Sequence, residues 1–367
     1  MRETKVNRLY YTSHSPINVY FSKNSRDFVV EEVPLYEFSG NGEHLVLKIR
    51  KKDMTTWELV QKISEVIGCK VRDIGYAGLK DKDGVTTQYI SIYKKYEKKI
   101  KNIQSQNIKI LETFYHNNKI RIGHLKGNKF YIRFKKVTSV DAKKIENVLK
   151  IIETNGLPNY FGYQRFGVEG NNYKIGKEIL FGKRFIKSRK KRNFFISAYQ
   201  SHIFNLWLSK RVEISKLFTS FSTKELESLF IYPKEVIKSI KNQPNFFKMF
   251  LGDVLHHYPY GKVFDCIEID KEVQRFAHKE LTITGILPGK KVKQANDIAG
   301  IIEKDFISEC ESVIDKMNGS RRFAWIFPEI LSQTYKKEEA WYELSFFLPK
   351  GSYATVLVEE ILHKSNH

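Results

Sequence analysis

The residues best suited to chemistry are a lysine and an aspartate in a glycine-flanked turn. Lys80 and Asp81 lie between Gly78 and Gly84, just ahead of a predicted strand that starts at Thr86. A carboxylate on a tight turn before a strand can be held rigidly toward a substrate, and the adjacent ammonium group favours its ionised form. The same spacing is typical of an exposed hairpin turn with solvated charges, so spacing alone leaves both interpretations open.

A second chemistry uses Asp81 together with Asp83. Two carboxylates at this spacing can hold Mg²⁺ in a metal-dependent nuclease or phosphotransferase. No third acidic ligand stands near them, and His256 and His257 have no matching ligands at helical spacing. The sequence therefore predicts no metal site, and the nuclease remains the weaker alternative.

Hydrophobic spacing predicts the elements that must position this turn. A helix is expected over residues 56–67, because Thr55 and Glu58 have the spacing of a capping box and Gly68 can end the helix. Alternating apolar residues predict strands around this helix. These strands lie at 28–33, 44–50, 86–93, 107–114, 119–125 and 129–135.

A second helix is predicted from Val140 to Thr154, with Ser139 as its cap. Residues 193–250 are mostly helical in pattern, and short strands return over 252–295. A strand at 342–348 and a helix at 354–362 close the chain. The apolar residues expected in the core of the helical region are Phe194, Phe195, Phe204, Leu206 and Trp207. Strand-rich ends around a helical middle predict an α+β protein with an inserted domain.

Composition favours a protein that binds a polyanion. The 367 residues include 63 Lys and Arg against 41 Asp and Glu, a net charge of +22, together with 26 Phe and 20 Tyr. Cationic groups bind phosphates by releasing counterions, and aromatic rings stack on unpaired RNA bases. A lysine-rich composition that results from an AT-rich genome would produce the same charge. The densest basic run contains Lys183, Arg184, Arg189, Lys190, Lys191 and Arg192, and a second cluster lies at 94–101.

Three features predict a cytoplasmic protein. The three cysteines are far apart and form no C-x-x-C pair, which disfavours disulfides and zinc: Cys69, Cys266 and Cys310. The N-terminus lacks the apolar region of a signal peptide. The sequence contains no run of about 18 apolar residues, so it predicts no membrane-spanning helix.

The turn also belongs to a longer motif. Residues 77–88 resemble the signature A-G-x-K-D-x-x-A/G-x-T-x-Q of the TruD family of tRNA pseudouridine synthases. Further family motifs follow in order, among them D-F-x-V-x-E at 27–32, G-N-x-F at 127–130, G-L-P-N-Y-F-G-Y-Q-R-F-G at 156–167, S-A-Y-Q-S at 197–201, G-S-R-R at 319–322 and G-S-Y-A-T at 351–355. The resemblance covers nearly the whole chain.

The resemblance assigns roles to individual residues. It implies that Asp81 is the catalytic residue, as nucleophile, cation stabiliser or base. The residues expected around the uridine are Phe130, Asn128, Lys80, Thr86 and Gln88. Many relatives carry a lysine where this chain has Ser22, and the neighbouring Lys23 is the candidate to replace it. Arg165 is expected to contact RNA.

The resemblance also implies a fold and a substrate. A pseudouridine-synthase core with a mixed, largely antiparallel sheet would comprise residues 1–155 and 308–367, and an inserted α/β domain specific to the family would comprise 156–307. The expected substrate is the uridine at position 13 of tRNA, often tRNA-Glu, with no cofactor, membrane association or obligatory protein partner. The other alternative is a non-catalytic RNA-binding or RNA-chaperone protein.

Overall fold

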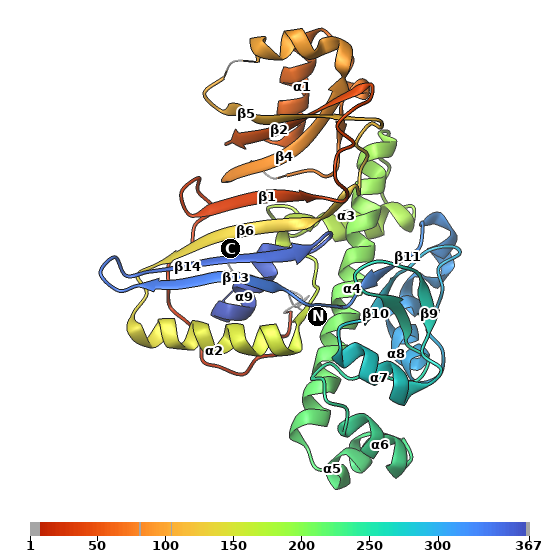
Figure 1. Cartoon of the computed structure of the whole chain (residues 1–367). Coiled ribbons are helices and arrows are strands. Elements are labelled where there is room, and N and C mark those ends of the chain that lie inside the picture. The colour runs from red at the N-terminus through yellow and green to blue at the C-terminus, as the bar shows by residue number, and fades with distance from the viewer. Residues whose placement is uncertain (1–7, 81, 104, 365–367) are drawn as a thin grey trace. The chain divides into compact units, whose positions relative to one another are not determined.

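The computed structural model describes residues 8–80, 82–103 and 105–364, and Figure 1 shows their course. The chain divides into two compact units. The sheet unit comprises Ile17–Leu149 and Pro328–Ser352, and the helical unit comprises the described residues of Met1–Pro16, Lys150–Phe327 and Tyr353–His367. The boundaries predicted at 156 and 307 describe an inserted domain implied by the family resemblance. The two compact units are defined differently, by contacts within the chain, so these boundaries stay a prediction.

The sheet unit is built on one mixed sheet. Among the described residues its eight strands run in the order β13-β14-β6-β1-β4-β2-β5, with β3 paired to β4 (Figure 1). Only the β1–β4 pairing is parallel in this part of the chain, so the predicted mixed, largely antiparallel sheet is confirmed. The strands are β1 (Phe28–Pro34), β2 (His44–Lys52), β3 (Gly75–Tyr76), β4 (Val85–Tyr93), β5 (Ile108–His116), β6 (Leu125–Lys135), β13 (Glu329–Lys336) and β14 (Trp341–Pro349).

Helix α1 (Thr56–Ile67) forms with the predicted ends. Thr55 and Glu58 make a reciprocal capping box, and Gly68 ends the helix in the left-handed conformation at φ 71°. The apolar side of α1 is buried against β2 and β4, in a cluster that includes Leu59, Ile63, Leu47, Ile49 and Ile90. Two 3₁₀ segments, η1 (Val71–Asp73) and η2 (Lys94–Asn102), flank β3 and β4 in the chain.

Helix α2 (Ser139–Asn155) corrects one prediction. Its cap is Thr138 rather than Ser139, because the Thr138 hydroxyl accepts from the Asp141 backbone N at 3.1 Å while the Asp141 carboxylate accepts from the Thr138 backbone N at 3.2 Å. An acidic residue three positions along thus selects the cap. Ile145 and Leu149 are buried, as the spacing predicts.

The separate strand predicted at 119–125 is wrong. Residues 119–124 are irregular with a turn at 122–123, and Leu125 is the first residue of β6. The apolar Ile120 is buried in a cluster with Val46 and Leu125, and its backbone N donates to the Ser91 hydroxyl at 2.9 Å. Gly123 then adopts φ 92°, which favours glycine and reverses the chain.

The helical unit surrounds a four-stranded antiparallel sheet in the order β11-β10-β8-β9, with a short β12–β7 pair. Its elements are β7 (Leu157–Pro158), η3 (Tyr163–Arg165), α3 (Asn172–Leu180), α4 (Arg189–Ser220), α5 (Thr223–Leu229), α6 (Lys234–Lys241), β8 (Val254–His257), β9 (Val263–Asp265), α7 (Ile269–Ala277), β10 (Leu281–Leu287), α8 (Asp297–Ile307), η4 (Ser308–Lys316), β11 (Ser320–Phe323), β12 (Trp325–Ile326) and α9 (Ala354–Leu362). The stretch predicted to be mostly helical, residues 193–250, contains most of α4 and all of α5 and α6.

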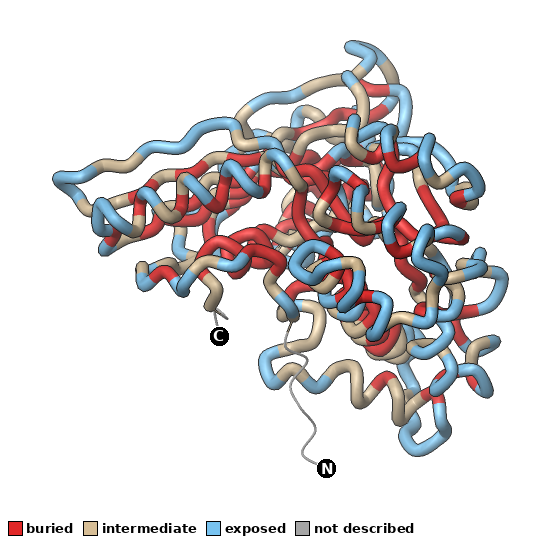
Figure 2. The backbone as a smooth tube through the Cα atoms, turned by 90° about the horizontal axis from the view of Figure 1, so that it is seen from below, coloured by how far each residue is buried: buried red, intermediate tan, exposed pale blue. Residues whose placement is uncertain are grey.

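Some of the residues expected in the core of the helical unit are buried, and one is exposed. Phe204 and Trp207 are buried, whereas Phe194 is 44% exposed, so that assignment is wrong. Phe194 lies in the first turns of α4, ahead of the stretch where the buried residues begin at Ala198. Figure 2 shows how buried residues follow the strands and the inner sides of helices, while turns are exposed. No helix in the described ranges is long and apolar enough to cross a membrane.

A buried ion pair holds α4 to the loop before β8. Arg211 donates two hydrogen bonds to the carboxylate of Asp253, at 2.7 and 2.9 Å, and both side chains are at most 2% exposed. The Arg211 guanidinium also lies within 6 Å of the ring centroids of Trp207, Phe247 and Phe250. Two-point pairing of arginine with carboxylate is strong and directional, so this pair fixes the middle of α4.

We expect Asp253→Ala to lower the free energy of unfolding by about 3–5 kcal/mol, because it leaves a buried guanidinium without its counter-charge. Glu213→Ala is the matched control, since Glu213 forms an exposed ion pair with Lys210 on the same helix and such pairs contribute at most about 1 kcal/mol. Urea denaturation of both variants measures the difference. Equal losses would contradict a structural role for the buried pair.

Candidate active site on one face of the sheet unit

Three strands bring distant motifs to one face of the sheet. In the β1–β6 pairing Val30 lies opposite Phe130 and Glu32 opposite Asn128, and in the parallel β1–β4 pairing Val30 lies beside Thr86. Side chains two positions apart on a strand share a face. The residues on this face are therefore Glu32 from β1, Thr86 and Gln88 from β4, and Asn128 and Phe130 from β6.

Lys80 is joined to this face by a buried ion pair. Its Nζ lies 2.9 Å from the Glu32 carboxylate, and the two side chains are 9% and 2% exposed. Glu32 is the last residue of the D-F-x-V-x-E motif, so two motifs about 50 residues apart meet in one contact. Sequence reasoning quoted Glu32 but gave it no role. A motif names residue types, and it does not say which of them touch.

The backbone of Lys80 is fixed as well. Its N–H donates to the Thr56 hydroxyl at 2.8 Å, and that hydroxyl donates to the Gln88 side-chain oxygen at 3.0 Å. The Lys80 carbonyl accepts from the Thr56 N–H at 3.4 Å. The start of α1 thus clamps the signature loop onto β4, and buried Gln88 supports Lys80 through Thr56. Asp81 itself lies outside the described residues.

Besides Oε2 of Glu32, whose charge is paired with Lys80, two uncharged polar atoms on this face are buried without a hydrogen-bond partner in the described structure. They are Nε2 of Gln88, a donor, and Oδ1 of Asn128, an acceptor. β1 separates their strands, so their backbones are about 10 Å apart at ordinary strand spacing. Buried polar groups are costly when unpaired, so both amides sit in an energetically unfavourable place.

Phe130 lies in a row of aromatic rings on the same face. Its ring is stacked on Phe346 at 5.3 Å between centroids and lies 6.2 Å from Phe28. The side chain is only 8% exposed. The ring is therefore held rigidly by its neighbours, beside Asn128, and serves the core as well as the face.

Lys23 precedes a tight turn that leads into β1. It is half-buried and makes no hydrogen bond or ion pair with another residue in the described ranges. The turn is fixed by Asn24, whose side chain accepts from the Asp27 backbone N at 3.0 Å. Burial alone would raise the pKa of Asp27, but hydrogen bonds from Lys135 and Asn24 hold it below its ordinary value. Asp27 is therefore an anion that anchors the start of β1.

Arg165 lies in the helical unit, beside a second arginine. Its Nε donates to the Ser201 hydroxyl at 3.1 Å, and burial lowers its pKa. Arg322, for which no role was predicted, lies 3.9 Å from the centroid of the Phe161 ring and donates to the Asn159 carbonyl at 3.0 Å. Removal from water lowers the pKa of Arg322 to about 10. Both arginines thus have structural partners inside the G-L-P-N-Y-F-G-Y-Q-R-F-G segment or near it.

The basic run lies on the connection from α3 to α4 and on the first turn of α4. Its exposed members are Lys183, Arg184, Arg189, Lys190 and Lys191, and Arg192 is half-buried. Arg184 is paired with Glu178 at 3.0 Å. The second lysine cluster lies in η2, where Lys99 donates to the Ile67 carbonyl and Lys94 lies over the Tyr115 ring.

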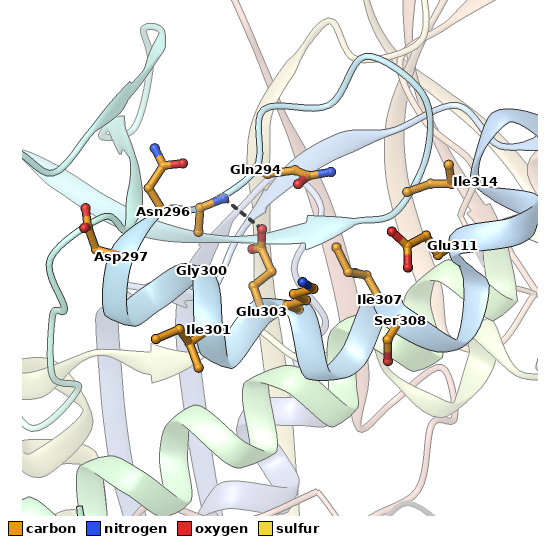
Figure 3. A pocket seen from close by; sticks show the side chains of 12 residues that line it. Gln294, Asn296, Asp297, Gly300, Ile301, Glu303, Ile307, Ser308, Glu311 and Ile314 are labelled. Carbon is orange, nitrogen blue, oxygen red and sulfur yellow. Dashed lines mark hydrogen bonds between the residues drawn. The ribbon is translucent and has the colours of Figure 1, made fainter. Parts of the chain in front are cut away.

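A pocket of about 460 Å³ lies along α8, apart from the predicted site residues (Figure 3). The Glu303 carboxylate on its wall is already satisfied by the Ala295 backbone N and by Arg321. Among the described residues no three His, Cys, Asp or Glu side chains cluster as a metal site would require. The nuclease alternative depends on Asp81 and lies outside this test.

Comparison with known proteins gives a consistent result. The family model described as tRNA pseudouridine synthase D (TruD) matches residues 5–185 and 230–361. A protein of Nitratiruptor sp. named tRNA pseudouridine synthase D is 55% identical, over 98% of this chain and 99% of its own. A protein of Sulfurimonas denitrificans with the same name is 52% identical, over 97% and 98%.

One solved structure supports the fold. A Methanosarcina mazei protein assigned to tRNA pseudouridine synthase D superposes with a TM-score of 0.67 at 21% identity, covering 97% of this chain and 96% of its own. At this identity the likeness concerns the fold alone. It agrees with the predicted combination of a mixed sheet and helices.

We expect Glu32→Gln to lower the free energy of unfolding by about 3 kcal/mol, because Lys80 would keep its charge in a buried place without a counter-charge. Glu112→Gln is the control, since Glu112 pairs with Lys48 at 2.8 Å on the same sheet but is 52% exposed.

A Lys80→Met, Glu32→Leu double variant should regain much of the lost stability, because buried ion pairs can be replaced by apolar residues at little cost. Urea denaturation of the single and double variants measures their free energies of unfolding. If Glu32→Gln is no more harmful than Glu112→Gln, the pair does not anchor the loop.

Proposed function

The chain belongs to the tRNA pseudouridine synthase D family, and from this premise we propose that it converts the uridine at position 13 of tRNA-Glu to pseudouridine, with Asp81 as the catalytic carboxylate. The observation that carries the assignment is the anchoring of Lys80, the residue before Asp81, through Glu32 and Thr56. This anchoring holds Lys80 to the face with Asn128 and Phe130, and it supports a catalytic role for the residue that follows it.

The reaction needs few chemical groups. The N1–C1′ bond of the uridine breaks, the uracil turns, and C5 bonds to C1′ while its proton is released and N1 gains one. The product has the composition of the substrate. Positive character at C1′ can be stabilised or captured by one carboxylate, as in glycoside chemistry, or the carboxylate can act as a base on the sugar. Asp81 would supply this group.

The sheet face suits a uracil that has left its stack. An enzyme acting on a base must extrude it into a pocket. Uracil presents carbonyl acceptors and an N–H donor on its pairing edge, and the half-buried Asn128 carries a side-chain amide that can pair with such an edge. The rigid ring of Phe130 lies beside Asn128 and would border the base. Lys23, in the segment before β1, would replace the family's active-site lysine beside the uridine.

The basic run would bind the phosphates of the tRNA. Arg189, Lys190, Lys191 and Arg192 fill the first turn of α4, where the helix dipole is already positive. Cations there repel the helix end unless an anion is bound nearby. The net charge of +22 has the same sign, and it would attract RNA over longer distances.

We expect Asp81→Asn to abolish pseudouridine formation while tRNA binding stays within about twofold of the wild type, since one carboxylate contributes little to phosphate binding. Activity is measured by reverse-transcription stops after carbodiimide treatment of the tRNA, and binding by filter retention. EDTA should leave the wild-type activity unchanged. Retained activity in Asp81→Asn would refute the catalytic assignment, and loss in EDTA would favour the metal-dependent alternative.

A second outcome distinguishes a non-catalytic RNA chaperone. Cells lacking the gene should lose a pseudouridine at position 13 of tRNA-Glu, and a plasmid copy should restore it, whereas the Asp81→Asn copy should not. An unchanged modification pattern in the deletion strain would favour the chaperone.

We expect replacement of Lys183, Arg189 and Lys191 by glutamine to weaken tRNA binding and to reduce the slope of log Kd against log salt by roughly two to three, because each phosphate contact contributes about one. The control replaces Lys224, Lys234 and Lys238, which are exposed on or beside α5 and α6. Equal slopes for the two triple variants would place the tRNA elsewhere.

A further inference from the structure

The most exposed aromatic side chain in the described structure lies inside the basic run. Phe185 is 84% exposed. Most exposed apolar residues need no explanation, but an exposed aromatic ring among several cations combines the two features that bind single-stranded nucleic acid. The neighbours of Phe185 are Lys183, Arg184 and Lys187, all exposed.

The segment that carries Phe185 is ordered at both ends. The backbone N atoms of Lys183 and Arg184 both donate to the Glu178 carbonyl, at 2.8 and 3.3 Å. On the other side the Ser188 hydroxyl accepts from the Lys191 backbone N and starts α4. The ring is therefore presented by a short, fixed connection between two helices, while the adjacent Ile186 is half-buried.

We propose that Phe185 is a stacking platform for an unpaired base of the bound RNA, with the phosphates on either side of that base held by Lys183 and Lys187. This rests on the proposed function only in that the ligand is RNA. Charge complementarity selects this occupant: a protein surface seated here would have to be strongly acidic, whereas a single-stranded RNA offers a flat apolar base between two anions. A duplex, whose bases are stacked internally, would use the cations but not the ring.

The test measures binding of two probes in the Asp81→Asn background, so that turnover cannot affect the result. One probe is fluorescein-labelled oligouridine, and the other is an RNA duplex of the same length. Phe185→Ala should weaken oligouridine binding about tenfold, which corresponds to about 1.4 kcal/mol, and should change duplex binding by less than twofold. Phe185→Trp should bind oligouridine as tightly as Phe185 does, because tryptophan keeps a flat ring. Phe185→Leu should bind it as weakly as Phe185→Ala.

Phe221→Ala provides the matched control, because Phe221 is also exposed but follows the far end of α4, outside the basic run. Three results would overturn the proposal: Phe185→Ala binding oligouridine as Phe221→Ala does, equal losses for oligouridine and duplex, or full rescue by leucine. A change in oligomeric state on gel filtration of Phe185→Ala would also overturn it, in favour of a protein contact. None of these results depends on catalysis by Asp81, so the proposed function is tested separately.

Discussion

The site depends on one buried ion pair, between Lys80 and Glu32. Transfer of two charges from water into a protein interior is costly, and their attraction repays this only when the geometry is good and other hydrogen bonds are satisfied. A pair of apolar residues would stabilise the sheet at lower cost. The pair is therefore better explained by position than by stability, since it fixes an ammonium group and the loop behind it at one point of the sheet face.

The strand register is the second constraint, because successive side chains of a strand point to opposite faces of the sheet. A shift of one residue between β1 and β6 would turn Asn128 and Phe130 to the opposite face. The aromatic row of Phe28, Phe130 and Phe346 opposes such a shift, because each ring loses its neighbours if the register changes. The same apolar contacts that stabilise the sheet thus keep the polar atoms of Gln88 and Asn128 on one side.

Some local signals predicted their elements, whereas others were overridden by a neighbouring local signal, as at Thr138, or by tertiary contacts. The ends of α1 followed from Thr55, Glu58 and Gly68, because a capping box and a left-handed glycine act within one turn. The expected strand at 119–125 failed because buried Ile120 belongs to an irregular segment bonded to Ser91, a contact outside any local window. Lys80 was found through its motif, but its partner Glu32 is set by strand pairing, which the sequence does not display.

The basic segment shows why charge alone is a weak guide to function. Arg184 and Arg165 each have partners within the protein, so their presence in a cationic stretch does not make them free for a ligand. At the start of α4 the helix dipole adds to the repulsion among the cations, and no residue of that first turn is acidic. An arrangement that is unfavourable in the free protein and relieved by an anion is best explained by an anion that binds there, and among polyanions an exposed phenylalanine in the same segment favours one with unpaired bases.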